Sequence, residues 1–247
     1  MNYVIIGNGT AAVGTIEGIR AVDQDGPITV ISEEPYHVYG RPLISYMLLG
    51  KTTEDKMLQY RPTDFYEKNG VTTLLGRKAV RIDPTAKAVK LEDGTSVPYD
   101  KLCICTGSRP FVPPMAGLDT VENKTSFMTL DDAKHLDAML GSENDKRVLI
   151  IGAGLIGLKC AEGIYQRVGE LTVIDLAPRI LPNVLTEVPA SIIQKHIESK
   201  GVKFLLEDSV EQFEPNTAHL KSGKAVEFDV LVVAVGVRPN TELAAEA

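Results

Sequence analysis

The stretch from Arg147 to Asp175 constrains the fold of this chain most strongly. An apolar run at 148–151 is followed by glycines at 152, 154 and 157, an amphipathic helical pattern, and a second apolar run that ends on Asp175. Glycines in G-x-G-x-x-G spacing between a strand and a helix let the backbone approach a pyrophosphate, which then lies on the free N–H groups of the helix. The whole arrangement predicts a Rossmann-type βαβ unit that binds a dinucleotide.

The acid at the end of the second strand indicates which nicotinamide cofactor is bound. A carboxylate at Asp175 accepts hydrogen bonds from the ribose hydroxyls and repels a 2′-phosphate, so it favours NAD over NADP. Arg179 lies nearby in sequence. It either accommodates a 2′-phosphate or is simply a surface cation or a partner for an acid, and we expect NAD to be preferred.

The same unit occurs a second time at the start of the chain. Residues 3–6 form an apolar run, Gly7, Gly9 and Ala12 follow in G-x-G-x-x-A spacing, and a second apolar strand leads to Glu33 and Glu34. One dinucleotide site is typical of a dehydrogenase. Two such sites indicate electron transfer between two dinucleotides, namely FAD and a nicotinamide.

Composition limits the class of protein and its partners. The chain has 247 residues, enough for two domains, of which 44% are hydrophobic and 24% charged. The net charge of −7 argues against nucleic acid or an anionic membrane as a partner. No apolar run reaches the roughly 20 residues of a membrane helix, and the N-terminus shows no signal peptide.

The cysteines indicate a reducing, cytoplasmic compartment. Cys103, Cys105 and Cys160 form no C-x-x-C and no metal-binding spacing, so no metal site is expected. Cys103 and Cys105 are predicted in one strand with their side chains on opposite faces. That placement would prevent a disulfide between them.

The order of predicted elements repeats over nearly the whole chain. Antiparallel meanders are predicted at 78–99 and 210–228. Buried strands at 102–105 and 230–235 are each closed by Gly-x-Arg-Pro. A helix is expected at 63–69 and others at 129–140 and 188–199. The fold class is therefore α/β, with two Rossmann-like domains of three-layer ββα character, one at 1–110 and one at 114–240.

This layout resembles the FAD- and NAD(P)H-dependent pyridine nucleotide-disulfide oxidoreductases, and within them the NADH:rubredoxin, ferredoxin and nitrite reductase branch. The resemblance rests on the two glycine fingerprints, on YGRPLIS at 39–45, on CICTGSRP at 103–110 and on VVAVGVRPN at 232–240. It implies that residues 1–110 bind FAD and residues 114–240 bind NAD(P)H.

The resemblance also implies which residues hold the cofactors. FAD would be held by Gly7, Gly9, Thr10, Ala11, Glu33, Val80, Thr106 and Gly107, with Arg41 and Pro42 in the loop near the flavin. By its chemistry alone, Arg41 is equally a structural cation. NADH would be held by Gly152, Gly154, Leu155, Ile156, Gly157, Asp175 and Gly236.

The chain departs from the family pattern in three places. The loop at 34–57 has no cysteine, which makes a thiol relay unexpected. Lys159 stands where many relatives carry Glu, so it either changes the nicotinamide site or extends to solvent. The family continues past residue 247 with a strand that completes the FAD domain, so the resemblance implies a fragment whose FAD domain lacks this return segment.

The expected activity is that of an FAD-dependent NADH oxidoreductase without a redox-active cysteine. Hydride would pass from NADH to the flavin, and electrons would then pass to a small redox protein such as rubredoxin, or to O₂. The cofactors carry this chemistry, so no catalytic side chain is assigned. The alternative is a truncated module that binds NAD, FAD or both without turnover. Homodimer formation is left open.

Overall fold

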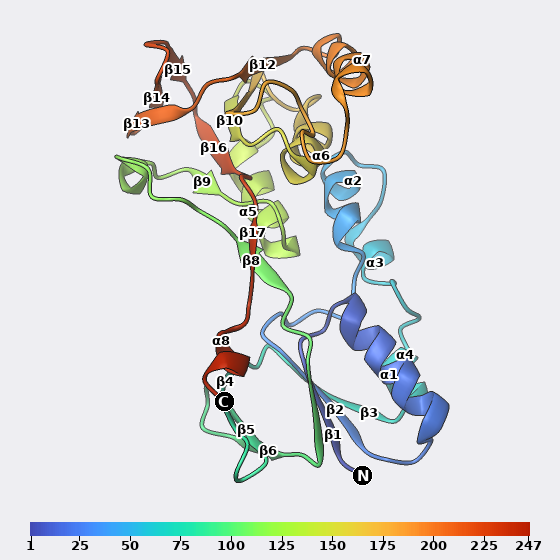
Figure 1. Ribbon diagram of the computed structural model, residues 1–247. Helices are drawn as coiled ribbons and strands as arrows, with labels where there is room; N and C mark the ends of the chain where they lie inside the picture. The colour runs from blue at the N-terminus through green and yellow to red at the C-terminus, as the bar shows by residue number, and fades with distance from the viewer. The chain divides into compact units, whose positions relative to one another are not determined.

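The computed structural model describes residues 1–247 and divides the chain into two compact units (Figure 1). Unit 1 comprises Met1–Gly40, Glu54–Arg109 and Pro239–Ala247, and unit 2 comprises Arg41–Thr53 and Pro110–Arg238. Two segments therefore group differently from the boundaries 1–110 and 114–240. Residues 41–53 belong to unit 2, and residues 239–247 belong to unit 1.

Unit 1 is built on a parallel sheet with strand order β3-β2-β1-β7. Its strands are β1 (Tyr3–Ile6), β2 (Ile28–Ser32), β3 (Val71–Leu75) and β7 (Lys101–Ile104). Helix α1 (Thr10–Val22) packs one face through Ala12, Val13 and Ile16 against Ile5, Ile28 and Val30. The other face packs against an antiparallel meander of β4 (Ala79–Asp83), β5 (Ala88–Leu91) and β6 (Ser96–Pro98).

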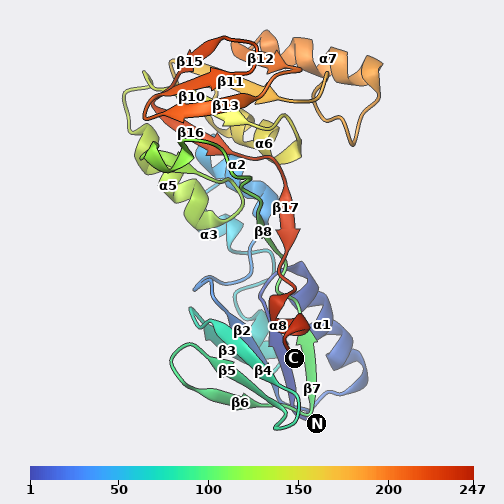
Figure 2. The same ribbon diagram turned by 60° about the vertical axis from the view of Figure 1, so that its left-hand side comes forward.

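Unit 2 repeats this three-layer arrangement around a parallel sheet with order β12-β11-β10-β16-β9. The strands are β9 (Lys124–Thr125), β10 (Arg147–Ile151), β11 (Glu170–Asp175), β12 (Val202–Leu206) and β16 (Val230–Val233). Figure 2 shows the meander of β13 (Val210–Glu214), β14 (Thr217–Leu220) and β15 (Ala225–Glu227) beside this sheet. Phe213 and Phe228 pack edge to face in the core between them.

Helices complete both units. In unit 2, α6 (Leu155–Ile164) follows the glycine turn. Helix α5 (Leu130–Leu140) begins at a capping box, in which Thr129 and Asp132 each accept a backbone hydrogen bond from the other residue. No helix is both long and apolar enough to cross a bilayer. Helix α7 (Glu187–Glu198) also belongs to unit 2. The remaining elements are short: η1 (Arg41–Leu43), α2 (Ile44–Leu48), α3 (Glu54–Met57), α4 (Phe65–Lys68), β8 (Ser108–Pro110), η2 (Leu118–Thr120), β17 (Val237–Pro239) and α8 (Glu242–Ala245).

The predicted α/β class and the internal duplication are confirmed, down to individual hydrogen bonds. Gly7 N donates to Ile31 O over 2.7 Å, and Gly152 N donates to Ile174 O over 2.8 Å. The residue that follows the neighbouring strand also makes an equivalent hydrogen bond in each half. The Cys105 N to Ile6 O distance is 2.7 Å, and the Ala234 N to Ile151 O distance is 2.8 Å. The two halves thus share a backbone plan.

Two expectations were wrong in detail. The sulfur atoms of Cys103 and Cys105 lie 3.6 Å apart, on one side of the chain and not on opposite faces. The reason is the period of a strand: neighbouring residues point to opposite faces, whereas residues two apart share a face. The helix expected at 63–69 is only the single turn α4, Phe65–Lys68.

Candidate dinucleotide sites

The glycine turn of unit 2 leaves no room for side chains. Gly152 has a φ of +111°, and a Cβ there would lie 2.3 Å from the carbonyl oxygen of Ala234. A Cβ on Gly157 would lie 1.9 Å from the carbonyl oxygen of Gly152. Gly154 is the N-cap of α6 and supplies no side-chain cap, so the first amides of the helix, at Leu155 and Ile156, have no side-chain acceptor at the N-cap. This is a backbone cradle of the kind that binds an anion.

Asp175 holds this turn in place. Its Oδ2 accepts a hydrogen bond from Ala153 N at 2.6 Å, and its Oδ1 accepts one from Ala177 N at 2.8 Å. A carboxylate oxygen has two lone pairs, so each oxygen can still accept another hydrogen bond. Because the side chain reaches from the end of β11 to the middle of the glycine turn, it links the two positions predicted for the ribose and the phosphates of a dinucleotide.

The loop after Asp175 is braced by Arg179. Its Nε donates to Leu185 O at 3.2 Å, and one terminal nitrogen donates to Pro182 O at 3.3 Å. Both partners are backbone carbonyls, so Arg179 is not the partner of an acid in this structure, and its role toward a 2′-phosphate stays a prediction. Three apolar residues around the turn stay exposed, namely Leu155 within it (63%), Leu176 after Asp175 (72%) and Val235 after Ala234 (37%).

Gly236, the last predicted residue of this site, has a φ of +140° and follows the carbonyl that packs on Gly152.

Lys159 does not extend to solvent. Its Nζ pairs with Glu162 and lies 4.2 Å from the centre of the Tyr46 ring on α2. The cation is thus covered by an aromatic ring and neutralised by an acid of its own helix.

The glycine turn of unit 1 has the same construction. Gly7 has a φ of +108°, and a Cβ there would lie 2.0 Å from the carbonyl oxygen of Cys105. Gly9 is the N-cap of α1 without a side-chain cap, and Thr10 and Ala11 stand exposed in the first turn. Where unit 2 has its third glycine, unit 1 has the buried Ala12.

Asn8, between the two glycines, is a residue of this turn that the sequence analysis missed. Its Nδ2 donates to Tyr36 O at 3.1 Å, and its Oδ1 accepts from the Tyr66 hydroxyl at 2.6 Å. Burial raises the pKa of Tyr66, so its hydroxyl remains a donor. A polar residue between fingerprint glycines was the available signal. Its partners, 28 and 58 residues away, were not readable from local pattern.

The other predicted FAD residues lie around this turn or on neighbouring elements. Glu33 is exposed, and its Oε1 accepts from Lys78 Nζ at 2.9 Å. Val80 on β4 is 44% exposed. Thr106 exchanges hydrogen bonds with Asn240, at 2.6 Å and 2.9 Å, and Gly107 O accepts from Asn240 N at 2.9 Å.

Arg41 and Pro42 belong to unit 2. They form η1 with Leu43, and a terminal nitrogen of Arg41 donates to Met128 O at 3.2 Å. The structure thus gives Arg41 a structural partner inside unit 2. Sequence order alone had placed both residues in the first domain.

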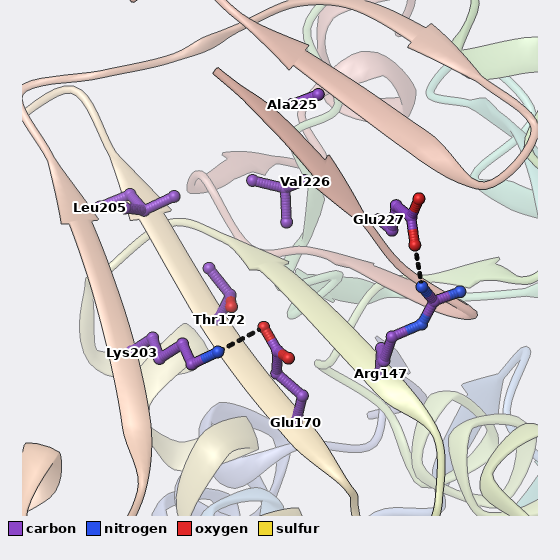
Figure 3. A pocket seen from close by; sticks show the side chains of 8 residues that line it. All are labelled: Arg147, Glu170, Thr172, Lys203, Leu205, Ala225, Val226 and Glu227. Atoms are coloured by element: carbon purple, nitrogen blue, oxygen red, sulfur yellow. Dashed lines mark hydrogen bonds and ion pairs between the residues drawn. The ribbon is translucent and has the colours of Figure 1, made fainter.

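A pocket in unit 2 lies at the opposite end of the sheet from Asp175 (Figure 3). It is lined by side chains at the starts of β10, β11 and β12 and by β15, and two ion pairs cross it, Lys203–Glu170 at 2.8 Å and Arg147–Glu227. Ligands of open parallel sheets bind at the carboxyl ends of the strands. This pocket is therefore distinct from the predicted dinucleotide site.

Comparison with known proteins places these turns in a family. The family model described as pyridine nucleotide-disulphide oxidoreductase matches residues 1–247. The chain is 35% identical to a nitrite reductase [NAD(P)H] of Bacillus subtilis (strain 168), covering 99% of this chain and 30% of that protein. It is 31% identical to an NADH oxidase of Methanocaldococcus jannaschii, covering 100% of this chain and 57% of that protein.

A solved structure shows the same fold. The crystal structure of the covalent putidaredoxin reductase–putidaredoxin complex matches with a TM-score of 0.88 and 28% identity, over 99% of this chain and 60% of that one. This chain therefore spans only part of the length of each of these proteins.

Proposed function

Since the chain belongs to the pyridine nucleotide-disulphide oxidoreductase family, we propose that it is the two-dinucleotide part of an FAD-dependent NADH oxidoreductase. The observation that supports this most directly is the pair of equivalent glycine cradles, each closed against the carbonyl of a neighbouring strand. A chain with one cradle would be a simple nucleotide-binding domain. Two cradles of one design suit two dinucleotides.

The residues present fit these cofactors. At Gly152 and at Gly7 a Cβ would overlap a backbone carbonyl, which keeps both turns bare for a pyrophosphate. In unit 2 the pyrophosphate would lie on the amides after Gly154, with the ribose hydroxyls at Asp175. In unit 1 it would lie on the amides after Gly9, with Glu33 toward the adenosine. When bound, the nicotinamide supplies a hydride and the flavin passes electrons on to an acceptor.

The protein's own contribution is binding, orientation and choice of cofactor. Asp175 presents an anion where NADPH carries a 2′-phosphate, and Arg179 is engaged with Leu185 and Pro182, so NADH is the preferred donor. The loop at 34–57 contains no cysteine, which supports electron transfer from NADH to the flavin without a thiol relay.

We propose a small redox protein as the acceptor, with O₂ as the alternative. The complex of a structural relative with putidaredoxin supports the first, and the relative named NADH oxidase keeps the second open.

Colour tests the proposal. The purified chain, incubated with FAD and desalted, should keep a flavin absorption spectrum that NADH bleaches under anaerobic conditions and NADPH bleaches far more slowly. Replacing Cys103, Cys105 and Cys160 together by Ala should leave the bleaching intact. A colourless protein that still binds NADH would favour the nucleotide-binding module without turnover. A flavin-loaded thiol-free variant that NADH cannot reduce would contradict the thiol-free route.

A further inference from the structure

Unit 1 contains two thiols that face each other beside the first glycine turn. The sulfur of Cys103, on β7, lies 3.6 Å from the sulfur of Cys105, one residue beyond the strand. Both sulfurs contact Thr15 Oγ1 of α1, at 3.5 Å and 3.7 Å. The Thr15 hydroxyl donates to Ala11 O at 2.8 Å, which leaves its oxygen to accept from the thiols. Thr15 thus holds the pair together without blocking either sulfur.

The backbone permits these sulfurs to bond. Residues two apart in a parallel strand are separated by about 6.6 Å at about 3.3 Å per residue, just inside the Cα spacing that disulfides span. β7 is the last strand of its four-stranded sheet and pairs with β1 alone, so its other edge has no ladder to break. The two thiols are half-buried, in contrast to the fully buried Cys160.

We propose that Cys103 and Cys105 form a two-thiol modification site, which low-molecular-weight disulfides convert into an intramolecular Cys103–Cys105 disulfide. This goes beyond the proposed function and does not depend on it. The thiol-free route for NADH concerns the transfer of hydride to the flavin. The thiol pair is a separate reactive site on the same unit.

The reaction takes place by two thiol–disulfide exchanges. The Cys103 sulfur loses its proton and attacks one sulfur of R–S–S–R, which breaks that S–S bond and releases the first small thiol. The Cys105 sulfur, deprotonated in turn, attacks the Cys103 sulfur of the mixed disulfide and releases the second. The protein gives up two electrons and two protons, and the small disulfide is reduced to two thiols.

The environment sets the order of these steps. Burial raises the pKa of the Cys105 thiol to about 11, with the neighbouring Cys103 thiol adding to the shift. A thiol that is protonated near neutral pH is a poor first nucleophile. We therefore assign the closing attack to Cys105, whose sulfur lies 3.6 Å from that of Cys103, so that proximity compensates for its small thiolate fraction.

Formation of the disulfide should be reversible and should alter the backbone at the glycine turn. A ring closed over a single intervening residue is strained, and strained disulfides are readily reduced. The carbonyl of Cys105 packs on Gly7, and Thr106 and Gly107 follow at once. Closing the ring therefore pulls on the backbone that forms one wall of the first cradle.

Mass spectrometry of the full chain tests the site. After incubation with glutathione disulfide, the wild-type monomer should lose two hydrogens and carry no adduct. Its thiols, titrated after unfolding, should fall from three to one, because the chain has three cysteines. A peptide with linked Cys103 and Cys105 should appear, and dithiothreitol should restore both thiols.

Single variants test the order of attack. Cys105→Ala should keep a glutathione adduct on Cys103, because the closing nucleophile is absent. Cys160→Ala, the matched control, should behave like wild type. The proposal is overturned if the wild-type chain keeps a stable adduct, forms disulfide-linked dimers or retains all its thiols. The wild-type measurement decides the matter even where a variant fails to fold.

Discussion

The two glycine turns share a backbone plan and differ in the side chains around it. Gly7 and Gly152 make equivalent hydrogen bonds, and each packs on the equivalent carbonyl after a neighbouring strand. Around Gly7 that carbonyl belongs to a cysteine, and a second cysteine and a threonine stand beside it. Around Gly152 it belongs to Ala234, with apolar Val232 two residues earlier. The geometry of the turn is therefore a property of the backbone, which leaves the adjoining side chains free to take on other chemistry.

The helices after the two turns differ in their outer faces. In unit 2, the five-residue α2 packs against α6, where a Cβ on Gly163 would lie 3.1 Å from Ser45 O. The equivalent residue of α1 is Gly18, around which there is open space. Helix α6 is thus covered by α2 at Gly163, whereas α1 is uncovered at Gly18. A glycine is required in one helix by packing and is merely tolerated in the other.

Alanine at the first glycine of either turn should have the largest effect. Gly7→Ala and Gly152→Ala each combine a positive φ with a Cβ position that lies only 2.0 Å and 2.3 Å, respectively, from a carbonyl oxygen. We expect each to weaken binding of its own dinucleotide by at least about a hundredfold, or roughly 3 kcal/mol, through strain and displacement of the turn. Calorimetric titration with FAD and with NADH, checked by circular dichroism, measures this.

Gly14→Ala is the matched control, because Gly14 lies on α1 with nothing within 4 Å of its Cβ position. It should bind both dinucleotides as wild type does. If Gly152→Ala impaired FAD binding and spared NADH, the assignment of the two turns would be reversed.

Asp175 and Glu33 should differ in their effect on dinucleotide binding. Asp175→Ala removes the acceptor for two backbone amides as well as the proposed ribose contact, whereas Glu33 is exposed and pairs only with Lys78 among the contacts described above. We expect Asp175→Ala to cost about 1–3 kcal/mol in NADH binding and to narrow the preference over NADPH. Glu33→Ala should cost FAD binding less than this.

Competition titrations with NADH and NADPH measure the change in preference. Arg179→Ala is the companion variant, and it should leave the NADH to NADPH ratio near that of wild type because Arg179 braces Leu185 and Pro182. A ratio moved strongly by Arg179→Ala and unmoved by Asp175→Ala would show that the wrong residue had been chosen.

The two helix glycines should respond to alanine with opposite signs. Gly163→Ala places a methyl group 3.1 Å from Ser45 O and 3.2 Å from Ser45 Cα, so α2 must shift, at a cost of about 1–3 kcal/mol. Gly18→Ala meets nothing and should stabilise by about 0.5–1 kcal/mol through helix propensity. Midpoints of urea unfolding compare the two. Equal destabilisation by both variants would show that Gly18 is as closely packed as Gly163 and would contradict this difference between the two helices.

The smallest effect, a difference in stability, is expected at the two aspartates that accept a hydrogen bond at the start of β1 and of β10. Asp100 accepts a hydrogen bond from Asn2 N at 2.7 Å, and Asp229 accepts the same bond from Arg147 N at 2.8 Å. Only Asp229 also pairs with a guanidinium, at 2.9 Å, and hydrogen bonds from Arg147 hold the pKa of this carboxyl below its usual value. Since the pair is about one-third exposed, Asp229→Asn should cost about 1 kcal/mol or less more than Asp100→Asn.

The pH dependence follows from the direction of this shift. A carboxyl whose folded pKa is lowered contributes full stability above its unfolded pKa, about 3.9, and loses it as the pH falls through the folded value. Thermal unfolding should therefore show a constant deficit for Asp229→Asn between about pH 5 and 7. The deficit should shrink below about pH 4. A deficit that grows on acidification would rule out the ion pair as its cause.

Local pattern was sufficient for most of the fold. Strand, glycine turn, helix and strand are encoded by short-range periodicity, and the two meanders carry turn residues between alternating strands. The prediction for Cys103 and Cys105 failed although the needed rule was local, since residues two apart in a strand share a face. The signal was in the sequence and was misread.

Contacts between distant segments were beyond local reading. The polar ties of Asn8 to Tyr36 and Tyr66, and of Thr106 to Asn240, join residues 28 to 134 positions apart. Residues 41–53 follow the first fingerprint in sequence, yet they group with the second unit, where α2 packs on α6. A helix of five residues is too short for its apolar periodicity to indicate which element it packs against.

The sequence by itself determined the two βαβ units, their glycine turns and the acid at the end of β11, because each depends on residues within one or two turns of each other. Tertiary structure decided which segment covers α6, that Arg179 braces a loop, and that Thr15 joins two thiols beside Gly7. Those outcomes depend on which surfaces meet when the chain is compact. Packing selects them through shape and hydrogen bonding between residues that no local pattern connects.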